Sequence, residues 1–204
     1  KLFKQKERLE KDGYKKNSNS WFIKNDENYV PLYEAKFFDN FDHRHGTFEG
    51  VDEDSRFGIK AEPNHPELIK KKDTEYEIEP RYWVNFDDVK IKQESKGNDD
   101  ELFFAFRNVC RTFTDSRTAR GTIIPFSAVG NSAPILLFKE SDSVKRLENM
   151  ILFSCVFTSL TFDYNVRQKL SGANLNKFIL MQIPAPKPDV FEHIKLKFNN
   201  QMKT

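Results

Sequence analysis

Residues 107–120, here called the arginine-rich stretch, carry the residue types that bind nucleic acid. The stretch holds four arginines and four hydroxyl residues, with one acid, Asp115, and no lysine. Its candidate contact residues are Arg107, Arg111, Thr112, Thr114, Ser116, Arg117, Thr118 and Arg120. An arginine fork can form two hydrogen bonds with a guanine edge or a phosphate, and hydroxyl groups commonly contact phosphates. The stretch therefore predicts a nucleic-acid contact loop, and the alternative is a solvated hairpin that happens to be rich in arginine.

Two further polar segments are candidates for phosphate contacts. Before the arginine-rich stretch, residues 39–45 are dense in polar side chains, and a lysine precedes them. After the stretch, two cations stand at the end of a predicted helix, and a Ser-Gly-Ala-Asn turn follows. Cations at that end of a helix also interact favourably with the helix dipole, which is the structural alternative. The candidates are Lys36, His43, Arg44, Arg167, Lys169 and Asn174.

Residues that could support an enzyme are fewer. Glu34-Ala35-Lys36 has the Glu-x-Lys spacing of metal-dependent nucleases, and His43 or His45 could add metal ligands. No third ligand is evident beside the histidines. The chain also has no Gly-rich phosphate loop, Gly-x-Ser-x-Gly elbow, Cys-x-x-Cys pair or Asn/Asp-Pro-Pro-aromatic tetrad. We therefore predict no catalytic residue, metal or cofactor in this chain, with a metal-dependent nuclease as the enzymatic alternative.

The composition limits the class of protein. A chain of 204 residues fits one large or two small domains, and a net charge of +2 confines any nucleic-acid surface to a local patch. Twenty phenylalanines predict a core packed by aromatic rings. Cys110 and Cys155 lie in apolar surroundings and are expected to be buried thiols, as in a reducing cytoplasm. The apolar run Met150–Phe157 is far too short to cross a membrane.

Several strands before residue 140 must position the arginine-rich stretch. Alternation, β-branched residues and turn signals set their bounds. The predicted strands are Trp21–Lys24, Tyr29–Phe38, Pro80–Phe86, Leu102–Arg111, Gly121–Pro125 and Ile135–Phe138. Leu102–Arg111 alternates well enough for a half-buried strand. Together with Gly121–Pro125 it would present Thr112–Arg120. Arg107 would then lie on a strand, which makes it the arginine best suited to a structural role.

Helices are predicted at both ends of the chain. Lys1–Lys11 has a charged helical pattern that Gly13 ends, and Asp142–Lys169 is a long helix. Asp189–Met202 is an amphipathic helix whose apolar stripe is Val190, Ile194 and Phe198. The expected buried face of the long helix comprises Val144, Leu147, Ile151, Cys155 and Thr158. We expect an α+β fold in which mixed, mostly antiparallel strands of the first two-thirds pack on this long buried helix.

The predicted organisation has three parts. Residues 1–18 are a connector helix from an upstream domain, and the non-methionine start at Lys1 agrees with this. Residues 19–188 form the main domain, and residues 189–204 form the C-terminal helix. Within the main domain, residues 46–72 have the pattern of a long irregular segment, for which no role is predicted.

Four stretches of the chain, taken in order, are similar to a known family. They are Pro31–Arg44, Pro80–Val84, Phe106–Pro125 and Asp163–Pro184. Together they resemble the C-terminal target-recognition domain of large bacterial adenine-N6 DNA methyltransferases, including type IIG restriction–modification and phage-defence enzymes, whose specificity domain is TaqI-like. The chain departs from the family at two points. It has Phe157-Thr158-Ser159 where Leu-Asn-Ser is frequent, and Ser171-Gly172 where Gly-Gly is common.

The resemblance implies a module that reads a short double-stranded DNA sequence. An upstream methyltransferase domain of the same chain would methylate a flipped adenine from S-adenosylmethionine. Phosphate contacts would set the register, and side chains on base edges in the major groove would read the sequence. The module itself would be non-catalytic and cytoplasmic, without a membrane partner. The alternatives are the nuclease and a scaffold whose helices dock on a methyltransferase subunit, and the recognised bases stay open.

Overall fold

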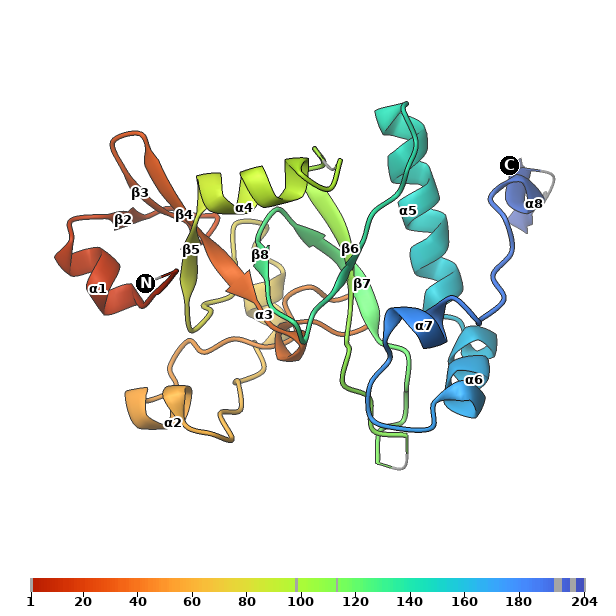
Figure 1. Ribbon diagram of the computed structural model, residues 1–204, viewed down its shortest axis with the longest axis horizontal. Helices are drawn as coiled ribbons and strands as arrows, with labels where there is room; N and C mark the ends of the chain where they lie inside the picture. The colour runs from red at the N-terminus through yellow and green to blue at the C-terminus, as the bar shows by residue number, and fades with distance from the viewer. Residues whose placement is uncertain (1, 98, 113, 193–195, 199–200, 204) are drawn as a thin grey trace. The chain divides into compact units, whose positions relative to one another are not determined.

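The computed structural model describes residues 2–97, 99–112, 114–192, 196–198 and 201–203 (Figure 1). The chain is α+β with antiparallel sheets, which confirms the predicted class. None of the helices in this described part is long and apolar enough to span a membrane.

The chain divides into two compact units, which interrupt each other in sequence. Unit 1 comprises Lys1–Val109 and Arg120–Leu137, and unit 2 comprises Cys110–Ala119 and Phe138–Thr204. The arginine-rich stretch is therefore shared between the units. Arg107 belongs to unit 1, as does Arg120, whereas the segment between them from residue 110 to residue 119 belongs to unit 2.

Unit 1 is built on a six-stranded sheet with the order β1-β5-β4-β3-β2 and with β8 beside β4. Neighbours along the main path are antiparallel, and β8 pairs with β4 in parallel. The strands are β1 (Phe3–Lys4), β2 (Lys15–Lys16), β3 (Phe22–Lys24), β4 (Glu27–Tyr33), β5 (Trp83–Asn85) and β8 (Ala128–Val129). The strand predicted for Tyr29–Phe38 ends at Tyr33, because the chain turns into a short 3-10 helix, η1, at Ala35–Phe37.

A smaller sheet in unit 1 has the order β7-β6-β9. Its strands are β6 (Leu102–Phe106), β7 (Gly121–Pro125) and β9 (Ile135–Leu136). β7 has the predicted bounds and pairs with β6 from Leu102↔Pro125 to Phe106↔Gly121. The half-buried alternation predicted for β6 is wrong, because residues 103–106 are all buried and both faces of the strand are therefore covered. The prediction also extended this strand to Arg111, whereas it ends at Phe106.

The core of unit 1 is aromatic, as the phenylalanine count predicted. One large cluster joins η1, β4 and the smaller sheet. The buried members are Tyr33, Phe37, Phe38, Phe48, Ala61, Ile78, Phe103, Ala105, Ile124 and Ala133. Ring pairs meet edge to face, for example Phe37 and Phe48 with centroids 5.7 Å apart. Such pairs add to the stabilisation from burial because the positive ring edge meets the negative ring face.

The helices of unit 1 are short. They are α1 (Lys6–Lys11), α2 (Glu53–Phe57), α3 (Leu68–Lys71) and α4 (Phe86–Glu94). The helix predicted from Lys1 begins only at Lys6, because β1 precedes it and pairs with β5. Helix α4 was not predicted. It begins where Asn85 Oδ1 accepts a hydrogen bond from the Asp87 amide at 2.9 Å, and Figure 1 shows it lying over β4 and β5.

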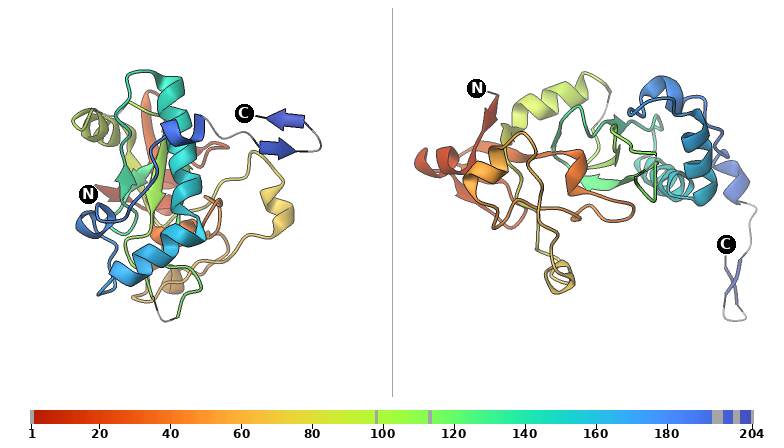
Figure 2. Two further views of the ribbon diagram at one scale, coloured as in Figure 1. Left: turned by 90° about the vertical axis from the view of Figure 1, so that its right-hand side faces the viewer. Right: turned by 90° about the horizontal axis from the view of Figure 1, so that it is seen from below.

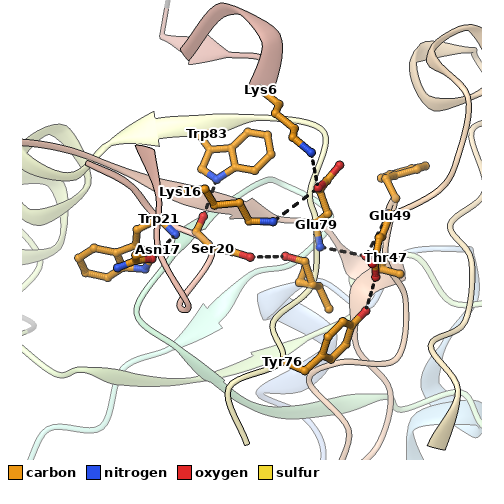
Figure 3. Close-up of polar contacts among 12 residues, drawn as sticks. Lys6, Lys16, Asn17, Ser20, Trp21, Thr47, Glu49, Tyr76, Glu79 and Trp83 are labelled. Carbon is orange, nitrogen blue, oxygen red and sulfur yellow. Dashed lines mark hydrogen bonds and ion pairs between the residues drawn. The ribbon is translucent and has the colours of Figure 1, made fainter. Parts of the chain in front are cut away.

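Glu79 is a polar centre of unit 1 (Figure 3). Its side chain is 9% exposed, and its carboxylate lies 3.0 Å from Lys6 Nζ, 3.5 Å from Lys16 Nζ and 2.9 Å from Arg56 Nη2. Its amide donates to Thr47 Oγ1 at 2.9 Å. Burial alone would raise the pKa of Glu79, but the hydrogen bond from Lys6 and the three positive charges hold it below its ordinary value. The residue therefore fastens α1 and β2 to α2.

Unit 2 is mainly helical in its described part. Its first two helices, formed by residues 143–157 and 160–169, cross at a steep angle (Figure 2). The helices are α5 (Ser143–Phe157), α6 (Leu160–Lys169), α7 (Lys177–Leu180) and α8 (Asp189–Glu192). The prediction of one helix from Asp142 to Lys169 is wrong. Ser159 adopts an extended backbone between α5 and α6, and its hydroxyl accepts from the Phe162 amide at 3.2 Å, which caps a second helix.

The predicted buried face of α5 is also wrong. The buried residues of this helix are Met150, Ser154 and Phe157. Of the predicted face, only Thr158 is buried, and the exposed members are Val144, Leu147, Ile151 and Cys155. A helix with apolar residues on several sides offers more than one candidate stripe, and tertiary contacts select among them. Cys110, in contrast, is buried as expected.

The C-terminal segment differs from the predicted helix over Asp189–Met202. Helix α8 ends at Glu192, and β10 (Leu196–Phe198) and β11 (Gln201–Lys203) form an antiparallel pair. Ile194, which the prediction placed on the apolar stripe, lies outside the described residues. The antiparallel strands β10 and β11 therefore occupy the part of the chain where the prediction continued the helix.

Candidate nucleic-acid interface

A buried acid holds the end of the arginine-rich loop in unit 2. Asp163 lies on α6 and is 6% exposed. Its Oδ1 accepts from the Thr118 amide at 2.7 Å and from the Ala119 amide at 2.6 Å, and it lies 3.7 Å from Arg117 Nε. Charge-assisted bonds of this kind are roughly twice as strong as neutral ones. The loop backbone is therefore fixed on the helix.

Two arginines of unit 2 have structural partners. Arg117 donates to the carbonyls of Thr158 and Ser159, at the turn between α5 and α6. Arg167 donates from Nε to Thr118 Oγ1 at 2.9 Å, and from Nη2 to the carbonyls of Asp115 at 3.1 Å and Ser116 at 3.3 Å. Both guanidinium groups thus brace the loop against α6. Thr118 is buried, so its hydroxyl supports the loop instead of facing outward.

Several polar side chains of unit 2 stay exposed on the loop that Asp163 and the two arginines hold, and on the turn after α6. The Cys110 amide donates to the Ala173 carbonyl at 2.7 Å, which places Arg111 beside the turn that carries Asn174. Arg167 joins the same loop to the last turn of α6, where Lys169 is exposed. We call this set the loop–turn surface, and its members are Arg111, Thr114, Ser116, Lys169 and Asn174. Thr112 is half-buried next to it.

Arg111 is the exposed arginine of the loop. Its guanidinium has no hydrogen-bond or ion-pair partner among the residues that the structure describes, whereas its carbonyl accepts from the Asp115 amide at 3.0 Å. A fixed backbone with an unengaged guanidinium is suited to contact an external anion or base edge.

The remaining two arginines converge on one acid in unit 1. Arg107 Nε donates to the Phe38 carbonyl at 3.0 Å, and its Nη2 lies 3.6 Å from Asp39 Oδ2. Arg120 Nη1 lies 3.4 Å from the same oxygen. Both arginine side chains are largely buried, at 16% and 17% exposed. The structural role predicted for Arg107 agrees with these contacts.

The cations of the earlier polar segment are also engaged. Arg44 donates to three backbone carbonyls, those of Lys71 at 2.9 Å, Asp73 at 2.9 Å and Tyr76 at 2.8 Å. Lys36 Nζ donates to the Ala61 carbonyl at 2.6 Å. The Arg44 guanidinium thus holds residues 71–76, which begin at the end of the irregular segment and continue beyond it.

The histidines of this segment have acidic neighbours. His43 Nε2 lies 3.9 Å from Glu77, and His45 lies within 3.9 Å of Asp39 and Asp42. Burial is the largest influence on His45 and keeps its pKa below the ordinary value. Among the described residues, no three His, Cys, Asp or Glu side chains come together as metal ligands do.

The Glu-x-Lys pair of the nuclease alternative has other partners. Glu34 accepts from Arg81 Nε at 2.8 Å and Arg81 Nη2 at 2.5 Å, and Lys36 Nζ lies 3.9 Å away from Glu34. Burial lowers the pKa of Lys36. The bidentate contact with Arg81 gives Glu34 a structural partner within the fold.

Phe41 is a feature that the sequence reasoning missed. It has φ of 60°, in the left-handed region that bulky residues avoid, and it is 69% exposed. It stands at the tip of a turn closed by Asp39 and Asp42, whose amides and carbonyls bond each other at 2.8 and 3.0 Å. A lone aromatic residue inside the polar run of residues 39–45 was the available signal.

In comparisons with known proteins, no family model, curated protein or solved structure matches this chain.

Proposed function

We propose that the chain is a sequence-specific recognition module for double-stranded DNA, belonging to an adenine-N6 DNA methyltransferase. The observation that carries the proposal is the loop–turn surface, where Arg111 and its polar neighbours stand exposed on a braced loop. The four ordered stretches that resemble target-recognition domains support the same reading. The proposed fold is accordingly of the target-recognition type.

The braced loop is what a recognition element requires. Residues that read a ligand from loops depend on a rigid scaffold to hold them. Asp163 and Arg167 bond three consecutive parts of the loop, at Asp115, Ser116 and Thr118–Ala119. The backbone therefore needs little ordering on binding, and less of the interaction free energy is lost to entropy.

The partners of the arginines define their proposed roles. Arg107, Arg117, Arg120 and Arg167 already bind carbonyls or acids, so their main proposed task is to hold the fold near DNA. Arg111 is proposed to contact a guanine or a phosphate directly, with Lys169 and Asn174 as backbone contacts. Thr114, together with Ser116, would add phosphate donors. Lys36, His43 and Arg44 are proposed as a second, weaker phosphate-contact set.

The charge of the chain fits a module that works with another domain. With a net charge of +2, the chain has no general field for DNA. The proposed parent protein would supply the catalytic domain, S-adenosylmethionine and much of the affinity, in the bacterial cytoplasm, for restriction–modification or phage defence. The chain alone is proposed to be non-catalytic and to bind duplex weakly.

Replacing Arg111 with alanine should weaken duplex binding by the chain. If Arg111 donates two hydrogen bonds to a guanine edge, the loss is about 1–3 kcal/mol in binding free energy. If it contacts a phosphate, the log–log salt slope should fall by about 0.9. Fluorescence anisotropy with a random-sequence duplex pool, over a salt series, measures both quantities.

Lys139→Ala is the matched control, because Lys139 is an exposed cation of unit 2 outside the loop–turn surface. Its loss should leave affinity nearly unchanged. Equal affinities of wild type and a folded Arg111→Ala/Lys169→Ala variant would rule out the loop–turn surface as the DNA contact. No binding by the wild-type chain at low salt would count against the module itself.

A second candidate role is docking on the methyltransferase domain. The observation that favours it is the exposed apolar stripe of α5, where Val144 is 65% exposed and Ile151 is 46% exposed. Ile151→Asp should abolish capture of a separately produced catalytic domain in a pull-down, while the exposed Glu148→Ala should not. Capture by the Ile151→Asp variant at the wild-type level would eliminate this face as the docking surface.

A further inference from the structure

We propose that Phe41 is a stacking residue, which inserts its ring against an unstacked base of bound DNA. The proposal rests on the proposed DNA-recognition function and adds to it a residue outside the loop–turn surface. Three observations carry it: the backbone conformation of Phe41, the rigidity of its turn and the charges around the turn.

The conformation of Phe41 is unfavourable for its residue type. At φ of 60° the Cβ atom of an L-residue crowds the backbone, and glycine or asparagine is the usual occupant. Burial of the ring could offset this, but the residue is 69% exposed. Strained residues of this kind persist where the surrounding structure enforces them, and they cluster at ligand-contact sites. The packing of unit 1 therefore gives no reason for an aromatic ring here.

The turn that carries Phe41 is held on both sides. The Asn40 side chain accepts from the Gly121 amide at 3.0 Å, which ties one side to β7. On the other side, Asp42 accepts from Lys71 Nζ at 2.5 Å and from the Arg44 amide at 3.0 Å. A rigid turn presents its ring without an entropic penalty on binding, as an inserted wedge requires.

The charges around the turn favour nucleic acid as the occupant. Three cations pair with the two acids of the turn: Lys71 Nζ lies 2.5 Å from Asp42, and Arg107 and Arg120 lie 3.6 and 3.4 Å from Asp39. The guanidinium of Arg44, two residues beyond Asp42, donates to backbone carbonyls rather than to either acid. The excess of positive charge attracts a phosphate backbone, whereas an apolar protein partner would have to bury these charges. Base faces are π surfaces, so a ring stacks on any base.

The experiment compares three variants in the full chain. Phe41→Asn removes the ring and suits the left-handed backbone, Phe41→Trp keeps a ring, and Phe3→Ala removes a half-exposed ring elsewhere in unit 1. The probes are a short mixed-sequence duplex and the same duplex with one unpaired 2-aminopurine, whose fluorescence reports stacking. Thermal melting is measured in parallel.

Loss of one stacking contact should lower affinity for the unpaired-base duplex by about 5- to 150-fold in Phe41→Asn. The 2-aminopurine signal should change with wild type and Phe41→Trp but not with Phe41→Asn, and Phe3→Ala should behave as wild type. Because the strain is relieved, the melting temperature of Phe41→Asn should be unchanged or raised by about 2–4 °C.

Unchanged DNA affinity in Phe41→Asn would overturn the stacking role while leaving DNA recognition intact. A lower melting temperature would show that the ring supports the fold, and would overturn it too. If Phe41→Asn changes only self-association in sedimentation, the ring contacts protein instead of DNA. Failure of the wild-type chain to bind either duplex would instead reject the underlying recognition function.

Discussion

Replacing Asp163 with alanine is expected to destabilise unit 2 by about 3–5 kcal/mol, the range for removing one partner of a buried charged network. The variant leaves the amides of Thr118 and Ala119 without their acceptor, and each unpaired buried donor costs about 1–3 kcal/mol. Arg117 would also lose the Asp163 carboxylate, which lies 3.7 Å from its Nε. The loop should therefore detach from α6 before the helices unfold.

Hydrogen exchange is the suitable measurement for this variant. Both tryptophans, Trp21 and Trp83, lie in unit 1, so tryptophan fluorescence does not report on unit 2. Exchange at the Thr118 and Ala119 amides should accelerate strongly in Asp163→Ala. Asp163→Asn keeps an acceptor oxygen at the same position and should show a smaller effect. Equal protection of these amides in wild type and Asp163→Ala would refute the anchoring role.

Replacing Glu79 with alanine should destabilise unit 1 by about 3–5 kcal/mol, because it leaves a buried cation unpaired. Arg56 is 8% exposed and its Nη2 lies 2.9 Å from Glu79. Urea unfolding followed by tryptophan fluorescence measures the change, since Trp83 is fully buried in this unit. Glu94→Ala is the control. Its pair with Lys90 is exposed at 4.0 Å and contributes at most about 0.5 kcal/mol.

The stabilisation from Glu79 should depend on pH in a defined direction. Its pKa in the folded protein lies below the ordinary value of 4.5, so the folded state binds its proton less readily than the unfolded state. The contribution is complete above about pH 4.5 and is lost as pH falls through the folded pKa. The stability difference between wild type and Glu79→Gln should therefore shrink below pH 4.5. If the stability difference between wild type and Glu79→Gln stays constant below pH 4.5, Glu79 does not stabilise the fold as an ionised carboxylate.

Local patterns predicted some elements well. Gly121–Pro125 forms β7 with the predicted bounds, because a β-branched run that ends at a proline has few other options. Gly13 follows the end of helix α1, as expected, and its φ of 87° is a conformation that glycine adopts readily. Asp142 caps α5 through the Lys145 amide at 2.9 Å. Each of these features depends on residues within a few positions of each other.

Errors arose where distant residues decide the outcome. The sequence of α5 permits several apolar stripes, and contacts within the folded chain bury the one through Met150 and Phe157. β6 was predicted to be half-buried because its residues alternate, but residues 103–106 are all buried, so the fold covers both faces of this strand. Ser159 separates α5 from α6, although the apolar pattern continues through it. Periodicity reports local preference and cannot identify which neighbour covers a face.

The candidate site shows the same division. The sequence alone shows which groups are available for binding: four arginines and their hydroxyl neighbours, in a chain whose net charge is only +2. Tertiary structure decided which arginines are engaged, since Arg107 pairs with Asp39 and Arg117 with the α5–α6 turn. These partners lie about forty or more positions away in sequence, as do Asp163 and Thr118. A guanidinium binds whichever carbonyl or carboxylate folding brings within reach, so residue type fixes its chemistry and the fold fixes its partner.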